Sequence, residues 1–123
     1  MKRISTNNAP AAIGPYSQGI EKGNMVFISG QIPVNPETGE IEEGITSQAT
    51  RSLNNLKAIL EEAGLTTKNV VKTTVFLQSM SDFSEMNKVY ESFFEGIFPA
   101  RSCVEVAALP KGALVEIECI AVR

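Results

Sequence analysis

The sequence predicts an α+β fold in which two amphipathic helices pack on one face of a mixed β-sheet. Three observations lead to this prediction. Apolar residues recur at helical spacing in two separate segments, short runs rich in β-branched residues flank these segments, and turns with glycine or proline separate them. The 123 residues are 43% hydrophobic and 20% charged, with an even composition that predicts a single domain over residues 1–123.

The N-terminal third reads as strands and turns. Residues 3–5 can form a short edge strand, and residues 18–21 and 25–29 alternate in a way that is typical of strands. The intervening Lys22-Gly23-Asn24 is a hairpin signal. Residues 31–44 contain two prolines and two glycines, so we expect an irregular surface loop there.

The first helix is expected to begin at Ile45, where the period of the apolar residues changes. Thr46 or Ser47 could cap its start, and Gly64 stands where a left-handed C-terminal cap belongs. The residues on its apolar face are Ile45, Ala49, Leu53, Leu56, Leu60 and Ala63.

A second helix is expected from about residue 81, because Asp82 and Glu85 have the spacing of a capping box. Its apolar face consists of Met86, Val89, Tyr90, Phe93 and Phe94. Residues 69–78 before it, dense in valine, predict a strand.

Two further strands are predicted at residues 102–107 and 114–122. In the last one Val115, Ile117, Cys119 and Ala121 form the side suited to lie under the helices. Its other side, with Glu116 and Glu118, is too apolar to be simply solvated. In the preceding strand, Arg101, Cys103 and Glu105 share one side. We expect a half-apolar sheet face, with arginine and glutamates embedded in it, to be buried against another copy of the chain, with a site near that interface.

Charge and composition exclude several classes of protein. The formal net charge of −3 and a pI of about 5.0 argue against a general nucleic-acid binder. The residues after Met1-Lys2-Arg3 are polar, unlike a signal peptide, and no apolar run is long enough for a membrane span, so we expect a cytoplasmic protein. The absence of histidine excludes serine and cysteine triads and makes a metal site improbable. The two cysteines, Cys103 and Cys119, are expected to be small buried hydrophobes.

The segment from Phe98 to Val106, together with Glu116, is the strongest indication of chemistry. Arg101 follows a proline turn at the start of a strand, and its planar guanidinium is suited to binding a carboxylate through two hydrogen bonds. Glu116 lies among apolar neighbours, which should raise its pKa toward values useful in proton transfer. On the residues alone, Arg101 could equally form a salt bridge between subunits with Glu105 or Glu118, and Glu116 could be neutralised in the same way.

Four long motifs resemble the reactive intermediate deaminase family (RidA/YjgF). They are residues 11–19 (AAIGPYSQG), 29–33 (SGQIP), 98–106 (FPARSCVEV) and 115–118 (VEIE), and the likeness covers essentially the whole chain. One departure is Ala108, where many members carry arginine before the Leu109-Pro110-Lys111 turn.

The resemblance implies a chorismate-mutase-like fold and a homotrimer whose sheets form a central barrel, with sites between subunits. It implies hydrolysis of 2-aminoacrylate/2-iminopropanoate and 2-iminobutanoate to 2-oxo acids and ammonia without a cofactor or metal, which protects pyridoxal-phosphate enzymes from damage. Arg101 would hold the substrate carboxylate, Glu116 would activate water, and Cys103 would contribute mainly backbone groups. Other pocket residues implied by the resemblance are Tyr16, Ser29, Gly30 and Asn87.

These last residues also have plain structural interpretations. Tyr16 could be a half-buried packing residue, Ser29 an ordinary strand-end hydroxyl and Asn87 a polar surface residue. Two other functions stay open from the sequence: a regulatory protein that binds a 2-oxo acid without turning it over, and a ribonuclease or translation inhibitor. The second of these fits poorly with the acidic pI and the lack of histidine.

Overall fold

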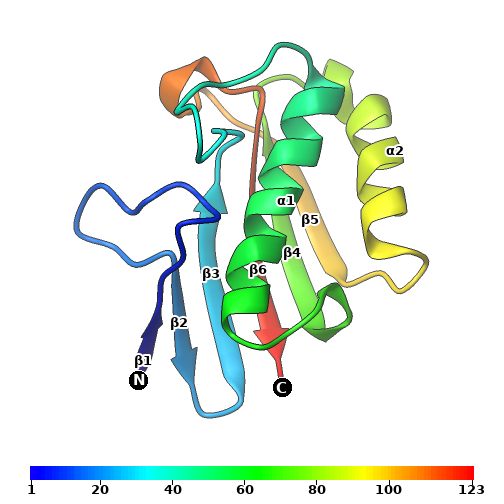
Figure 1. Ribbon diagram of the computed structural model, residues 1–123. Helices are drawn as coiled ribbons and strands as arrows, with labels where there is room; N and C mark the ends of the chain where they lie inside the picture. The colour runs from blue at the N-terminus through cyan, green and yellow to red at the C-terminus, as the bar shows by residue number, and fades with distance from the viewer.

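A computed structural model describes all 123 residues and has two helices on one face of a six-stranded mixed sheet, as predicted (Figure 1). The two α-helices are α1 (Ile45–Glu62) and α2 (Phe83–Phe94). The strands are β1 (Lys2–Ile4), β2 (Gly19–Lys22), β3 (Met25–Gln31), β4 (Val70–Leu77), β5 (Ala100–Glu105) and β6 (Val115–Val122).

The strand order is β1-β2-β3-β6-β4-β5, and only β4 and β5 run parallel. Helix α2 connects these two strands, because a parallel pair needs a crossover that returns the chain to the same end of the sheet. The last strand, β6, lies in the middle between β3 and β4. Because β6 has a strand on each side and helices over its inner face, all four of its inward residues are at most 3% exposed.

The core lies between the helices and the inner face of the sheet. From β6 it takes Val115, Ile117, Cys119 and Ala121, as the alternation predicted. The chain has no helix that is both long enough and apolar enough to cross a membrane. The outer face of the sheet carries no helix, and large apolar side chains on it, including Phe27 and Val104, remain exposed.

Neither predicted N-terminal cap makes a side-chain hydrogen bond. Helix α1 begins at Ile45 as expected, but the residue at its N-cap is Gly44, with a positive φ of 86°, so Thr46 and Ser47 already lie within the helix. Asp82 does occupy the N-cap of α2, but its side chain forms no capping hydrogen bond; the side-chain cap is that of Ser79, at the start of the 3₁₀ turn before the helix. Gly64, with φ 75°, does end α1 as expected.

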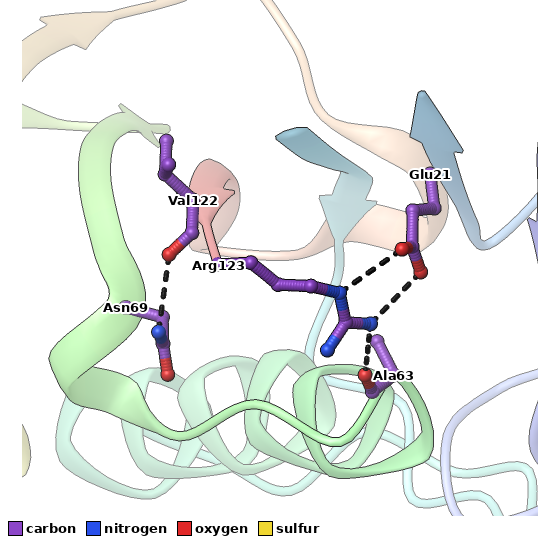
Figure 2. A network of polar contacts seen from close by, with 5 residues as sticks. All are labelled: Glu21, Ala63, Asn69, Val122 and Arg123. Atoms are coloured by element: carbon purple, nitrogen blue, oxygen red, sulfur yellow. Dashed lines mark hydrogen bonds and ion pairs between the residues drawn. The ribbon is translucent and has the colours of Figure 1, made fainter. Parts of the chain in front are cut away.

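Arg123 ties three elements together at the end of the sheet (Figure 2). Its guanidinium donates two hydrogen bonds to the carboxylate of Glu21 on β2, at 3.0 and 2.9 Å, and a third to the carbonyl of Ala63 just after α1. The arginine therefore binds a carbonyl at the C-terminus of α1 and a carboxylate on β2 at the same time. The hydrogen bond and charge of Arg123 lower the pKa of Glu21 below its ordinary value of 4.5.

We expect Glu21→Gln to lower the melting temperature at pH 7 by roughly 1–3 °C, a small effect because the pair is exposed. The folded pKa is depressed, so the stabilisation by the charged carboxylate is present above pH 4.5 and is lost as the pH falls through the folded pKa. Thermal melts of both proteins at pH 7, 5 and 3 should therefore converge at the acid end. Glu40→Gln, on an exposed loop, is the matched control. If Glu21→Gln lowered the melting temperature equally at pH 3 and at pH 7, the charge of Glu21 would not be the source of the stabilisation.

Candidate active site

Arg101 lies at the start of β5 against one side of α2. Its guanidinium carbon is 4.7 Å from the ring centroid of Tyr90 and 5.6 Å from that of Phe83, and its Nη1 donates a hydrogen bond of 2.8 Å to Oδ1 of Asn87. Stacking on a tyrosine contributes about 0.5–2 kcal/mol, depending on how far the pair is desolvated. These contacts fix the plane of the guanidinium without neutralising its charge.

No carboxylate lies within ion-pair distance of Arg101 in the chain, whose two salt bridges involve Arg123 and Lys88. Only one of its five N–H donors has a partner. The group borders an open pocket of about 520 Å³. That pocket is lined by Asn87, Tyr90, Glu91, Phe98, Pro99 and Arg101. A half-buried, unpaired guanidinium held flat at the edge of a pocket is suited to binding a carboxylate.

Glu116, on β6, lies against the backbone of Gly30. Between Ile28 and Gln31 the pairing of β3 with β6 shifts register, so that β3 carries an extra residue at this point. A Cβ on Gly30 would lie 2.9 Å from Cδ of Glu116, closer than real side chains approach. The carboxylate occupies this space because residue 30 has no side chain.

The pKa of Glu116 is raised above its ordinary value of 4.5, first by burial and then by the neighbouring charge of Glu118. Both effects disfavour the anion, as the apolar run in the sequence predicted. Glu116 is thus a carboxyl group that can take up and release a proton closer to neutral pH than an exposed glutamate can.

Arg101 and Glu116 lie on opposite faces of the sheet, which corrects the expectation that they share one. Strand β4 shows this directly: Thr73, buried under the helices, pairs with Arg101, whereas Phe76, on the outer face, pairs with Glu116. The alternation within each strand was predicted correctly, but the arginine side of β5 faces α2. Within one chain the two groups therefore do not share a pocket, and Glu116 does not line the pocket of Arg101.

Cys103 is on the same side of β5 as Arg101, and its side chain packs at the edge of the core. Burial raises the pKa of its thiol, although the charge of Arg101 acts in the opposite direction. A thiol held protonated is a poor nucleophile. Cys119 is buried, and its pKa is raised to about 12, so it is the inert core residue that was predicted.

Tyr16 and Gly30 line a second pocket, of about 340 Å³. The hydroxyl of Ser29 donates a 2.6 Å hydrogen bond to the carbonyl of Ser17, so this side chain holds the loop that carries Tyr16. The predicted site residues therefore fall into two groups. Arg101, Asn87 and Cys103 lie on the helix side, and Tyr16, Ser29, Gly30 and Glu116 lie around the outer side of β3 and β6.

Sequence reasoning missed two contributors. Gln18 was assigned only to a strand, yet its buried side chain donates to the carbonyls of Thr6, Ala9 and Pro10 and accepts from the amide of Thr6, which fixes the loop leading to Tyr16. Tyr90 was assigned only to the apolar face of α2, yet it stacks on Arg101. A spacing pattern shows that Tyr90 faces inward but not that an arginine from another strand lies over it.

Comparison with known proteins shows a family and a fold that match those of this chain. The profile of a family described as Endoribonuclease L-PSP matches residues 6–123. The 2-iminobutanoate/2-iminopropanoate deaminase of Escherichia coli K12 is 58% identical over 125 residues, which cover 99% of this chain and 98% of that protein. The structure of the E. coli YjgF gene product has a TM-score of 0.97 at 57% identity, covering 100% of this chain and 99% of the other. That of E. coli TdcF with bound serine also has a TM-score of 0.97, at 52% identity and with the same coverage.

Gly30→Ala is expected to fold normally while displacing the Glu116 carboxyl, because the clashing atoms belong to the end of a flexible side chain. Once displaced toward solvent, the carboxyl should titrate closer to 4.5 than in the wild type. A ¹³C NMR titration of Glu116, assigned through Glu116→Gln, measures this change. If the titration of Glu116 were unaltered, or if the melting temperature fell by more than about 5 °C, the glycine would be needed for the backbone conformation of β3 and not to make room for the Glu116 carboxyl.

Proposed function

The chain belongs to the endoribonuclease L-PSP family, and we propose that it hydrolyses reactive 2-enamino and 2-imino acids to 2-oxo acids and ammonia. The proposed substrates are 2-iminopropanoate and 2-iminobutanoate, the two acids in the name of the E. coli relative, and 2-aminoacrylate, the enamine tautomer of the first. The RidA/YjgF resemblance is confirmed by identity over the whole chain. The observation that carries the proposal is the unpaired guanidinium of Arg101, held by Tyr90 and Asn87 beside an open pocket.

Arg101 binds the carboxylate that all these substrates share. Its free N–H donors can form two parallel hydrogen bonds to a planar carboxylate, which fixes both the position and the orientation of the adjacent C=N carbon. Serine in the E. coli TdcF structure has a carboxylate of the same kind. Cys103 lies two residues along the same strand and on the same side, so its backbone groups can contact the same end of the substrate.

Glu116 activates the water. The enamine first tautomerises to the imine; water then adds to the C=N carbon, and the resulting carbinolamine loses ammonia to leave the 2-oxo acid. Glu116 accepts a proton from the attacking water and passes it to the imine nitrogen, which gives the carbinolamine. It then takes the proton of the carbinolamine hydroxyl and delivers it to the same nitrogen, so ammonia leaves, the C=O bond forms and the carboxylate is regenerated. Its raised pKa favours both transfers near neutral pH. Because water is the nucleophile, this chemistry requires no nucleophilic side chain, metal or cofactor.

The site is formed by two copies of the chain in a homotrimer. Arg101 and Glu116 face opposite sides of one sheet, so a site that contains both needs Arg101 from one subunit and Glu116 from its neighbour. The outer sheet face supports such an assembly, since Phe27 and Val104 leave apolar surface uncovered there. Trimers with closed symmetry give every subunit both roles.

Cleavage of RNA, the activity in the family description, has weaker support from this chain. Its net charge of −3 opposes phosphate binding, and it has no histidine for general acid–base cleavage. Incubation with a labelled RNA at low and high salt separates this activity from deamination.

Arg101→Ala should raise KM by at least about 100-fold, because the carboxylate loses a charge-assisted bidentate contact. Glu116→Gln should lower kcat by about 100-fold or more with little change in KM. The measurement generates 2-aminoacrylate or 2-iminobutanoate in the cuvette with a lyase or dehydratase and follows its decay. Thr50→Ala, an exposed residue of α1 that lines neither the Arg101 pocket nor the Tyr16 pocket, is the control. No acceleration by the folded wild-type protein with either substrate would exclude the deaminase and favour a 2-oxo-acid-binding regulator.

Mixing the two inactive variants tests the shared site. In trimers reassembled at random from equal amounts of Arg101→Ala and Glu116→Gln chains, about one quarter of the interfaces combine an intact Arg101 with an intact Glu116. Activity should therefore return to about a quarter of the wild-type value after joint refolding and stay absent when the folded trimers are simply combined. No recovery in verified mixed trimers would mean that one chain supplies both groups or that Glu116 has no catalytic role.

A further inference from the structure

A buried pair of hydroxyl groups lies directly behind Arg101. Thr73 on β4 is fully buried, Tyr90 on α2 is 5% exposed, and Oγ1 of Thr73 is 2.7 Å from the hydroxyl oxygen of Tyr90. Each hydroxyl is the other's only hydrogen-bond partner within the chain. Valine and phenylalanine would fill the same space without any polar group to satisfy, so packing alone does not explain the pair.

The pair holds the tyrosine ring in one place relative to Arg101. Thr73 and Arg101 are directly paired across β4 and β5 on the same face of the sheet, so Tyr90 packs over both. Because the hydroxyl is bonded to Thr73, the ring cannot swing away, and its face lies 4.7 Å from the guanidinium carbon. Asn87, three residues earlier on α2, accepts from Nη1 and fixes the rotation of the guanidinium within its plane.

We propose that Tyr90, oriented by Thr73, is a positioning residue that preorganises Arg101 for the substrate carboxylate. This inference rests on the proposed function of Arg101. An arginine side chain has large rotamer entropy, and a ligand that must order it loses binding free energy. The stacked ring and Asn87 order the guanidinium before binding, so the remaining donors already point to the pocket.

The variants separate the ring from the hydroxyl. Tyr90→Leu removes the stacking surface and should raise KM, and the Kd for 2-oxobutanoate in calorimetry, by about tenfold. Tyr90→Phe and Thr73→Val each remove one hydroxyl and should raise both constants by about two- to fivefold, whereas Thr73→Ser keeps the hydroxyl and should restore wild-type values. Phe93→Leu, an aromatic residue on the same helix without contact to Arg101, is the control.

The double variant Thr73→Val/Tyr90→Phe distinguishes positioning from stability. Each single change leaves a buried hydroxyl unsatisfied and should lower the melting temperature, but the double change removes both and should recover it. KM and Kd should stay raised in the double variant, because the ring is no longer anchored. Recovery of KM together with stability would overturn the proposal and leave the pair with a purely structural role.

A readout that needs no substrate keeps the two proposals apart. The ¹⁵Nε–¹H signal of Arg101, assigned through Arg101→Lys, should be shifted upfield by the tyrosine ring and should show a high order parameter that falls in Tyr90→Phe and Thr73→Val. If Arg101→Ala leaves the Kd for 2-oxobutanoate unchanged, the proposed function fails. If Arg101→Ala abolishes binding while the Tyr90 and Thr73 variants leave Kd and the NMR signal unchanged, only the positioning inference fails.

Discussion

The position of β4 between β5 and β6 determines where every functional group of this protein points. Side chains alternate along a strand, and paired residues on neighbouring strands share a face. Through Thr73 and Phe76, β4 therefore assigns Arg101 to the helix side and Glu116 to the outer side of the sheet. A slip of one residue in either pairing would move one of these groups to the other face and bury a charge in the core or expose core residues. The pairing register of β4 with β5 and β6 thus places the core residues under the helices and also places Arg101 and Glu116 on opposite faces of the sheet.

Helix α2 combines core and site on adjoining faces. Met86 and Phe94 fill the core, Asn87 points to the pocket, and Tyr90 belongs to both, since its ring contacts Phe94 on one side and Arg101 on the other. A helix places residues three and four apart side by side, so one turn can supply a core contact and a polar contact to the same arginine. The site is consequently as rigid as the core on which it is built.

Much of this organisation is readable from the sequence, and the failures have specific causes. The spacing of apolar residues correctly predicted the helices and strands, the inner face of β6 and the burial of Cys119. This works because buried side chains recur at every second residue in a strand and at every third or fourth residue in a helix. The capping hydrogen bonds were predicted wrongly, because Gly44 and not a hydroxyl residue precedes α1, and because a 3₁₀ turn capped by Ser79 leads into α2. The side of β5 that meets α2 was assigned wrongly: the side with Arg101 was expected on the uncovered face of the sheet because it is charged, but it faces α2, where Tyr90 and Asn87 contact the guanidinium. Gln18 and the Thr73–Tyr90 pair were missed because their partners are distant in the chain and no local spacing indicates them.

Glu116 and Arg101 are unpaired charged groups of opposite sign, and assembly of the proposed trimer would change the surroundings of both. Glu116 is a carboxyl group that burial and Glu118 make reluctant to ionise, while Arg101 is a cation without a counterion. Covering the outer face with a second chain removes water from Glu116 and raises its pKa further, unless the same contact brings a positive charge nearby. In the proposed trimer, Arg101 of that second chain would be such a charge, and a substrate carboxylate bound to it would partly cancel its effect on Glu116. Substrate binding would then raise the pKa of Glu116 and make it a stronger base, so the proposed site would couple proton transfer to carboxylate recognition.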